Sequence, residues 1–466
     1  MLNLSTRLPG LPQALPRPSL PVAATSAAVL AVVAAGLRSP HSPRLLFELF
    51  VGALLVVLTF RWLLAGTVLF IIVTFPAQLP GSIGAGATVA KPFGIVLACS
   101  WLLALLSDRR RPLLFRDRPV LGAFLAAYLG WGVASLFWSA DTGATVDGVK
   151  RLVLAVLFFV VLFSVARTTH ELVVLLSAYV AGSAATSVYA LASGVAIAGG
   201  RLTGGLNDPN YLASELVLAI IAGGYLLGTT RRFALRVVLV GAVGVDLTAF
   251  LLTQSRGGLV GIAVGVVAAI VVAGRTRAVV LAVTTLAAAL AMGYFALIAP
   301  AQVRNRVSNF STSASSGRSD SWQIAWQIAK DHPITGVAIG GYRNEQLKYV
   351  SSTIDIQHIG FVLNDRLVVH NTYLETLAEL GLVGFLLLGG TMALSVRSGW
   401  KAIRLADQAG DRGLANAFRG LVAGSCGLFA SYVFVSAEYE KQLWIAIALL
   451  AASSSVASSR LQPKGT

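Results

Sequence analysis

Residues 257–274 read GGLVGIAVGVVAAIVVAG, a run without a charged side chain. Arg256 precedes this run, and Arg275 and Arg277 follow it. A helix needs roughly 20 predominantly apolar residues to cross the hydrocarbon core of a bilayer. An apolar run of this length with charges only at its ends therefore predicts a transmembrane helix that begins just after Arg256.

Similar apolar runs recur along the whole chain. Of its 466 residues, 56% are hydrophobic and only 12% are charged, whereas soluble domains usually carry about 25% charged residues. Reading the sequence in windows gives about 12 to 14 such runs. A membrane β-barrel would instead show short segments of alternating hydrophobicity. The sequence therefore predicts an all-α, polytopic integral membrane protein with one long extracytoplasmic loop region.

The apolar runs also suggest how the chain is divided. We expect a disordered cytoplasmic tail over 1–20, transmembrane helices over 21–298, an extracytoplasmic loop over 299–370, transmembrane helices over 371–458 and a cytoplasmic tail over 459–466. Within the loop, a helix from Ser319 to about Asp331 is expected to end before Pro333. Trp322, Ala325, Trp326 and Ala329 would form its apolar face, with the tryptophans as interface anchors rather than platforms for sugar stacking.

The formal net charge of +16 would suggest nucleic acid as the partner of a soluble protein, but here it indicates topology. Basic residues gather in connections at 108–118, 231–236, 275–277 and 395–414, which fall on alternate turns of the chain. The positive-inside rule places these connections in the cytoplasm. We therefore expect no nucleic-acid partner. The chain also has no CxxC, HExxH or Walker-type motif, so no metal or cofactor is expected.

Two arginines on the opposite side contradict the charge rule. Arg201 and Arg256 lie beside glycines near the ends of apolar runs. They could anchor helix ends by snorkelling, but their position favours a function. Asp208 and Pro209 could start the next helix with Asn210 as its cap, or Asp208 and Asn210 could contact a substrate. Asp246 could be the structural counter-ion of Arg256.

A histidine and a carboxylate mark the start of a later span on the same side. His370 stands at the start of the apolar run that follows the loop, and Glu375 lies within that run. Ionisable residues within a membrane span are costly and suggest function. Glu375 could orient His370, or it could pair with one of the arginines.

At these residues the chain resembles the O-antigen ligase family, which includes Wzy-type polysaccharide polymerases and bacterial protein O-oligosaccharyltransferases. Four pieces carry the resemblance over about residues 90–460: Arg201 to Asn210, Ser255-Arg256-Gly257, Gly317 to Gly341, and His370-Asn371-Thr372-Tyr373-Leu374-Glu375 with Glu379 to Gly384.

The resemblance implies a GT-C-type glycosyltransferase in the bacterial cytoplasmic (inner) membrane, with its active site on the extracytoplasmic face. Its donor would be a polyprenyl-diphosphate-linked glycan, used without a metal ion, cofactor or nucleotide sugar. The acceptor would be a hydroxyl on a glycan, lipid or protein, and the pathway would build cell-envelope polysaccharide. Arg201, Arg256 and Arg318 match arginines that would hold the diphosphate. His370 and Glu375 match the catalytic region.

The chemistry of such a transfer suits these residue types. Negative charge grows on the leaving diphosphate, and arginine binds phosphate through a planar fork that keeps its charge. Histidine is the usual general base near neutral pH. Ligase and polymerase differ only in the acceptor, and the sequence leaves both open. A transporter or flippase of an amphiphile, or a non-catalytic scaffold, is the alternative from another class.

Overall fold

The described part of the chain in this computed structural model comprises residues 43–75, 90–107, 113–194, 196–197, 200–203, 208–293, 296–297, 304, 318–350 and 368–461. Its first elements are α2 (Pro43–Arg61), α3 (Leu63–Thr74), α4 (Ala90–Ser107), α5 (Leu114–Asp117), α6 (Pro119–Ala134), α7 (Thr142–Val165) and α8 (Thr169–Ser193). The hairpin β1 (Ala196–Ile197) and β2 (Arg201–Leu202) leads to α9 (Pro209–Leu227), α10 (Phe233–Thr253), α11 (Arg256–Val272) and α12 (Arg277–Gly293). The last elements are α14 (Arg318–Asp331), α15 (Tyr342–Val350), α17 (Thr372–Gln408), α18 (Arg412–Ser431), η5 (Tyr432–Phe434) and α19 (Lys441–Leu461).

These elements confirm the all-α, polytopic fold class. Within the described ranges, 8 helices are long and apolar enough to cross a membrane, and five shorter apolar helices accompany them. The apolar run at 21–37 and the tails at 1–20 and 462–466 lie outside the described residues. The total of 12 to 14 spans stays a prediction.

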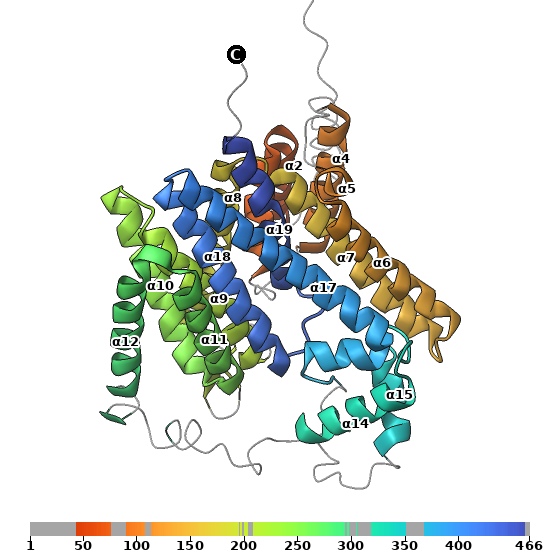
Figure 1. The fold of residues 1–466 in the computed structure, drawn as a ribbon. Helices are drawn as coiled ribbons and strands as arrows, with labels where there is room; N and C mark the ends of the chain where they lie inside the picture. The colour runs from red at the N-terminus through yellow and green to blue at the C-terminus, as the bar shows by residue number, and fades with distance from the viewer. Residues whose placement is uncertain are drawn as a thin grey trace, which may run out of the picture.

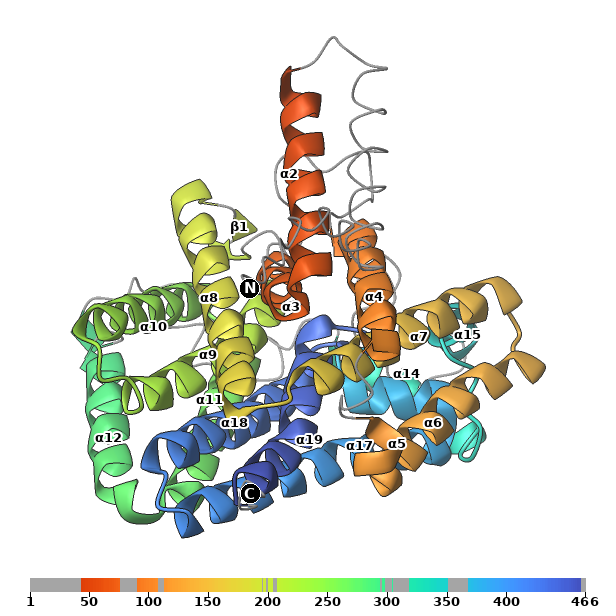
Figure 2. The ribbon, with the colours of Figure 1, turned by 90° about the horizontal axis from the view of Figure 1, so that it is seen from above.

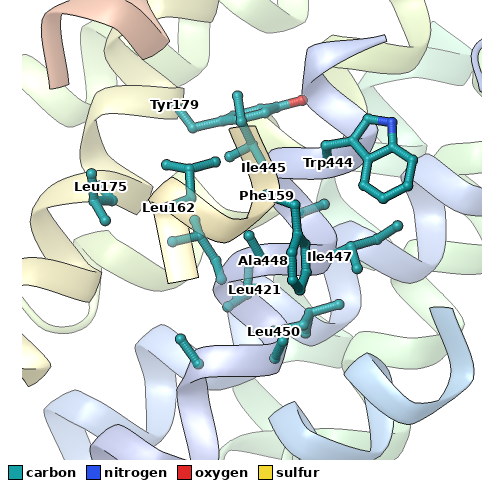
Figure 3. Close-up of a cluster of buried hydrophobic side chains, with 14 of the residues drawn as sticks. Phe159, Leu162, Leu175, Tyr179, Leu421, Trp444, Ile445, Ile447, Ala448 and Leu450 are labelled. Atoms are coloured by element: carbon teal, nitrogen blue, oxygen red, sulfur yellow. The ribbon is translucent and has the colours of Figure 1, made fainter. Parts of the chain in front are cut away.

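Helix α19 lies at the centre of the bundle. In its most apolar 18-residue stretch, 83% of the residues are buried, whereas the corresponding value for α10 at the periphery is 17%. Trp444, Ile445 and Ile447 of α19 meet Phe159 of α7 and Tyr179 of α8 in one buried cluster (Figure 3). Large apolar side chains on every face make α19 a core helix rather than a lipid-facing one. The views from the side and from above show the other helices around it (Figures 1 and 2).

The basic connections gather at one end of the bundle, as the charge pattern predicted. Arg419 near the start of α18 donates to both carboxylate oxygens of Asp407 at 2.8 Å and, through Nε, to the carbonyl of Val272 at 2.8 Å. At the same end, the Arg118 guanidinium reaches the Ser398 hydroxyl at 3.2 Å. These contacts bring together the connections around α5, α11 and α17. Helices α14 and α15 lie at the opposite end (Figure 1).

Helix α17 is broken at Gly381, where φ is 64° and ψ is −167°. The segment after α14 fills the break: the Leu382 amide donates to the Pro333 carbonyl at 2.8 Å, and the Val337 amide donates to the Ala378 carbonyl at 3.0 Å. Backbone groups released by a broken helix need such partners, because an unpaired one is costly within a membrane. The break thereby attaches the segment after α14 to the first turns of α17.

The loop helix forms where the sequence predicts it, but its buried face differs. Helix α14 spans Arg318–Asp331 and buries Ile324, Ala325 and Ile328. Trp326, expected on the apolar face, is 55% exposed. The reason is that α14 packs against α15 and α17, so its aliphatic side chains point inward and Trp326 points out.

Candidate functional site

Arg201 is anchored between two helix ends. It lies on β2, whose pairing with β1 sets Arg201 opposite Ile197. Its Nε donates to the Thr253 carbonyl, the last residue of α10, at 3.0 Å, and its Nη2 donates to Asn210 Oδ1 at 3.2 Å. The unpaired carbonyls at a helix C-terminus attract a cation. The guanidinium is therefore turned into the protein, which differs from the snorkelling alternative.

Asp208 and Asn210 begin α9. Asp208 is the N-cap. Its Oδ1 accepts one hydrogen bond from the backbone N–H of Asn210 at 2.8 Å and another from the Asn210 side-chain Nδ2 at 2.6 Å. The capping alternative was thus right about the helix start but wrong about the cap: Asp208 caps the helix, and Asn210 lies in its first turn with Pro209 before it. This frees the Asn210 side chain for contacts with other elements.

Asn210 connects the starts of α9 and α11. Its Oδ1 accepts from Arg201 and also from the Ser255 hydroxyl at 2.8 Å. Ser255 is in turn the N-cap of α11 and accepts from the Gly258 amide at 3.1 Å. Two helix N-termini therefore lie side by side. Since helix N-termini carry partial positive charge, this arrangement favours an anion nearby.

Arg256 is the first residue of α11 and is half-buried. Gln254, just before the Ser255 cap, adopts the left-handed conformation with φ 50° and so turns the chain sharply between α10 and α11. Arg256 thereby starts a helix whose cap, Ser255, is bonded to the Arg201–Asn210 pair.

The glycines after Arg256 serve helix packing. A Cβ atom at Gly257 would lie 2.6 Å from the Cβ of Phe434, and one at Gly258 would lie 2.8 Å from the Cβ of Ala213. Contacts this short do not occur between real side chains, so both positions need glycine. Arg256 is consequently held close to α9 and η5.

The expected counter-ion of Arg256 has other partners. Both oxygens of Asp246 accept hydrogen bonds from α8, one from Ser183 and one from Ser187, each at 2.7 Å. Asp246 is fully buried between α8 and α10. It therefore pairs two helices, and the expectation that it neutralises Arg256 is wrong.

His370 lies against the same cluster. Its Nδ1 is 4.0 Å from Oδ2 of Asp208, the oxygen that does not cap α9, and the two side chains are 14% and 22% exposed. Its backbone amide donates to the Ser436 hydroxyl at 3.0 Å. With φ at 54°, His370 occupies a backbone region that costs a non-glycine residue about 1 to 3 kcal/mol. Such a conformation persists because Ser436 and the Asn371 cap of α17 fix both sides of it.

The segment Val435–Glu440, which was not predicted to contribute, secures the start of α17. The Thr372 hydroxyl donates to the Val435 carbonyl at 2.7 Å and accepts from the Ala437 amide at 2.9 Å. The Tyr211 hydroxyl of α9 donates to the Ser436 carbonyl. One signal was present in the sequence: Ser436, Glu438 and Glu440 are polar residues in a short connection between two apolar runs.

The two carboxylates of α17 have different partners. Glu379 accepts from the amides of Gly340 at 2.7 Å and Tyr342 at 3.2 Å, and so caps α15. Glu375 is buried, and its Oε2 has no hydrogen-bond partner within the described residues. Its neighbours are Ser436, Glu438 and Arg151.

Arg151 of α7 is a further cation that the sequence did not single out. Its guanidinium stands 5.1 Å from the centre of the Tyr439 ring, a distance typical of a cation–π contact. It also attracts the buried carboxylate of Glu438, whose hydrogen-bond donor is Thr376 Oγ1 at 3.2 Å. Burial raises the pKa of Glu438, while Tyr439, Thr376 and Arg151 oppose that rise.

Arg318 is the first residue of α14 and is half-buried. It stands four residues before Trp322, so both lie on one face of the helix. The Trp322 ring is 6.2 Å from the ring of Phe434, the side chain that packs on Gly257. Arg318 thus lies on the side of α14 that faces η5 and the start of α11.

The ranges that the structure describes contain no group of three His, Cys, Asp or Glu side chains arranged to hold a metal ion. The cations of the site are arginines, and Arg201 is held by both a carbonyl and an amide oxygen. Residues 241–389 match the family model of O-antigen ligase. Over these residues the chain is similar to O-antigen ligase. No curated protein matches the chain.

The matched O-antigen ligase region includes Arg256, Arg318, His370 and Glu375 but ends short of the other contributors. Arg201, Asp208 and Asn210 precede it, and Ser436 follows it. Hydrogen bonds between Asn210 and Ser255 and between Ser436 and His370 attach these outer residues to the matched region. The domain match indicates a membrane enzyme of glycosyl transfer in polysaccharide biosynthesis.

Proposed function

We propose that this protein transfers a glycan from a polyprenyl diphosphate carrier to an acceptor hydroxyl at the extracytoplasmic face of a bacterial cytoplasmic membrane. The observation that carries the proposal is the position of Asp208. One of its oxygens belongs to the network of Arg201 and Asn210, and the other lies 4.0 Å from His370 Nδ1. The Asp208 carboxylate therefore lies between His370 and the Asn210 side chain that holds Arg201, a residue type suited to binding phosphate.

In the proposed reaction, His370 removes the proton of the acceptor hydroxyl. With Nδ1 turned towards Asp208, Nε2 is the nitrogen that takes this proton, and the carboxylate stabilises the imidazolium that forms. The acceptor oxygen bonds to the anomeric carbon as the bond from that carbon to the diphosphate oxygen breaks. The electron pair of the broken bond stays on the diphosphate.

The arginines would stabilise the charge that develops on the leaving group. Arg201 is held by Thr253 and Asn210, and Arg256 begins a helix beside it. Fixed cations need no rearrangement during the reaction, so they act most strongly on charge that appears in the transition state. Arg318 is proposed as a third contact to the diphosphate. Glu375, behind Ser436, is proposed to position the His370 segment rather than to touch His370.

The transporter alternative would need a helix break that opens onto a substrate site. The break of α17 at Gly381 does not offer one, because Pro333 and Val337 occupy the backbone groups that it releases. A scaffold would tolerate changes at His370 that leave the fold intact.

The test is complementation of a deletion strain with the wild-type chain, His370→Ala or His332→Ala at matched membrane levels. His332 is an exposed histidine in the same extracytoplasmic segment and serves as the control. We expect His370→Ala alone to abolish transfer. Single repeat units left on the carrier would identify a polymerase, and long carrier-linked chains that do not reach their acceptor would identify a ligase. Normal glycan in the His370→Ala strain would refute the proposal.

A further inference from the structure

A groove runs along the outside of α17, at the end of the bundle remote from His370. Its volume is about 600 Å³, and it is lined by Met392, Ala393, Val396, Arg397, Trp400, Arg404 and Phe429. All but Phe429, which belongs to α18, are residues of α17. The two helices pack side by side over this length (Figure 1).

The lining is apolar at one end and basic at the other. Met392 and Arg404 lie twelve residues apart on α17, which corresponds to about 18 Å along a helix. Met392, Val396 and Phe429 form the apolar end. Arg397, Trp400 and Arg404 follow one another at intervals of three and four residues, so they project from the same face of the helix. The groove therefore suits a long molecule that is apolar over most of its length and charged at one end.

The two arginines of the groove carry charge that the described residues do not neutralise. Arg397 and Arg404 are exposed, and within the described ranges neither makes an ion pair or a hydrogen bond. The Arg404 guanidinium stands 6.0 Å from the centre of the Trp400 ring. Arg419, at the same end of the bundle, is by contrast fully engaged with Asp407 and Val272. Two unneutralised guanidiniums at the edge of an apolar groove favour a phosphate ligand.

We propose that this groove binds one anionic phospholipid of the leaflet at the basic end of the bundle. Its phosphate lies between Arg397 and Arg404, its glycerol region lies against Trp400, and one acyl chain follows Val396 and Met392 towards Phe429. Basic pockets between transmembrane helices on the cytoplasmic side are known to receive anionic lipid headgroups, and tryptophan is enriched at this depth of the membrane.

The lipid of the groove differs from the proposed donor in the end of the bundle at which its charged group lies. The donor carries its diphosphate at the Arg201 end of the bundle, whereas the groove has its arginines at the other end. A donor whose diphosphate lies near Arg201 would leave Arg397 and Arg404 without an anion. The groove is therefore a second lipid site, and its test does not depend on catalysis.

The experiment is native mass spectrometry of the detergent-purified full chain, titrated with phosphatidylglycerol or phosphatidylcholine of identical acyl chains. We expect the wild type to prefer phosphatidylglycerol. A basic side chain near an anionic lipid surface contributes a factor of about five in affinity, so the double variant Arg397→Gln/Arg404→Gln should bind phosphatidylglycerol about thirtyfold more weakly. The matched double variant Arg231→Gln/Arg412→Gln, which changes two exposed arginines outside the groove, should bind like the wild type.

A second variant tests the apolar half of the groove. Val396→Trp fills the apolar half and leaves both arginines in place. It should weaken the binding of both phosphatidylglycerol and phosphatidylcholine. Equal binding of the two lipids by the wild type would overturn the proposal, as would unchanged binding in the groove variants. Displacement of phosphatidylglycerol by inorganic phosphate at equal concentration would identify a simple anion site instead, and would equally overturn it.

Discussion

One oxygen of the Asp208 carboxylate caps α9, and the other faces His370. Oδ1 holds the first turn of α9 through Asn210, and Oδ2 lies 4.0 Å from His370 Nδ1. Asn210 in turn receives Arg201 and Ser255. The same side chain thus fixes the start of a helix and the environment of the proposed base.

Asp208→Asn separates these two roles. Asparagine caps helices as well as aspartate does, so the variant should unfold at nearly the wild-type temperature. It lacks the charge that would stabilise a protonated His370, and we expect transfer to fall about tenfold or more. The measurement is the rate of glycan transfer in membranes, with thermal unfolding in detergent as the control. Full activity in Asp208→Asn would show that Asp208 acts only as a helix cap and does not assist His370.

Arg201→Lys keeps the positive charge but loses the planar fork that reaches the Thr253 carbonyl and Asn210 together. If Arg201 stabilises the leaving diphosphate, the rate of transfer should fall by about 10² to 10³, because lysine cannot reproduce the fixed geometry. Arg236→Lys, at an exposed arginine of the basic end, is the matched control. Equal rates for both variants would show that charge alone suffices at position 201.

Gly258→Ala tests the packing of α11 against α9. The new Cβ would meet Ala213 at 2.8 Å and Phe250 at 2.9 Å, and such overpacking typically costs about 1 to 3 kcal/mol. We expect lower thermal stability and reduced transfer, since Arg256 shifts with the helix. Gly244→Ala on α10, where nothing lies within 4 Å of the added atom, should be neutral or slightly stabilising. The argument fails if the two variants unfold at the same temperature.

Glu438→Gln tests the effect of pH on stability. Burial raises the folded-state pKa of Glu438 above its ordinary value of 4.5. The folded protein therefore holds the proton more tightly than the unfolded chain. The stability that the folded protein gains from holding this proton is fully present below pH 4.5. It is lost as the pH rises through the folded-state pKa of Glu438.

Glutamine keeps an oxygen for Thr376 and has no proton to lose. We expect thermal unfolding temperatures of Glu438→Gln to fall less between pH 4.5 and neutrality than those of the wild type. The control is Asp147→Asn, which changes an exposed carboxylate of α7. Parallel pH curves for the wild type and Glu438→Gln would contradict the assignment.

The sequence by itself determined the elements. Long apolar runs specify membrane helices because each apolar side chain adds to the cost of leaving the run in water, so the fold class, the bounds of α14 and the start of α17 could be predicted from composition and spacing. The end of α17 was predicted wrongly: the helix continues to Gln408, through residues expected to form a basic connection, and it is broken at Gly381. Charge position separated the basic end from the end that carries Arg201, Arg256 and His370. The O-antigen ligase motif pieces indicated the same residues.

Only the tertiary structure decided which groups meet. Asp208 faces His370, Ser436 holds the backbone of His370, Asp246 pairs with α8, and Arg151 reaches Tyr439. Each contact joins segments that are distant in the chain. Glycines such as Gly257 and Gly258 decide how closely α11 approaches η5 and α9. Hydrophobic periodicity carries no information on those distances, because helices within a membrane pack by shape and hydrogen bonding rather than by burial from water.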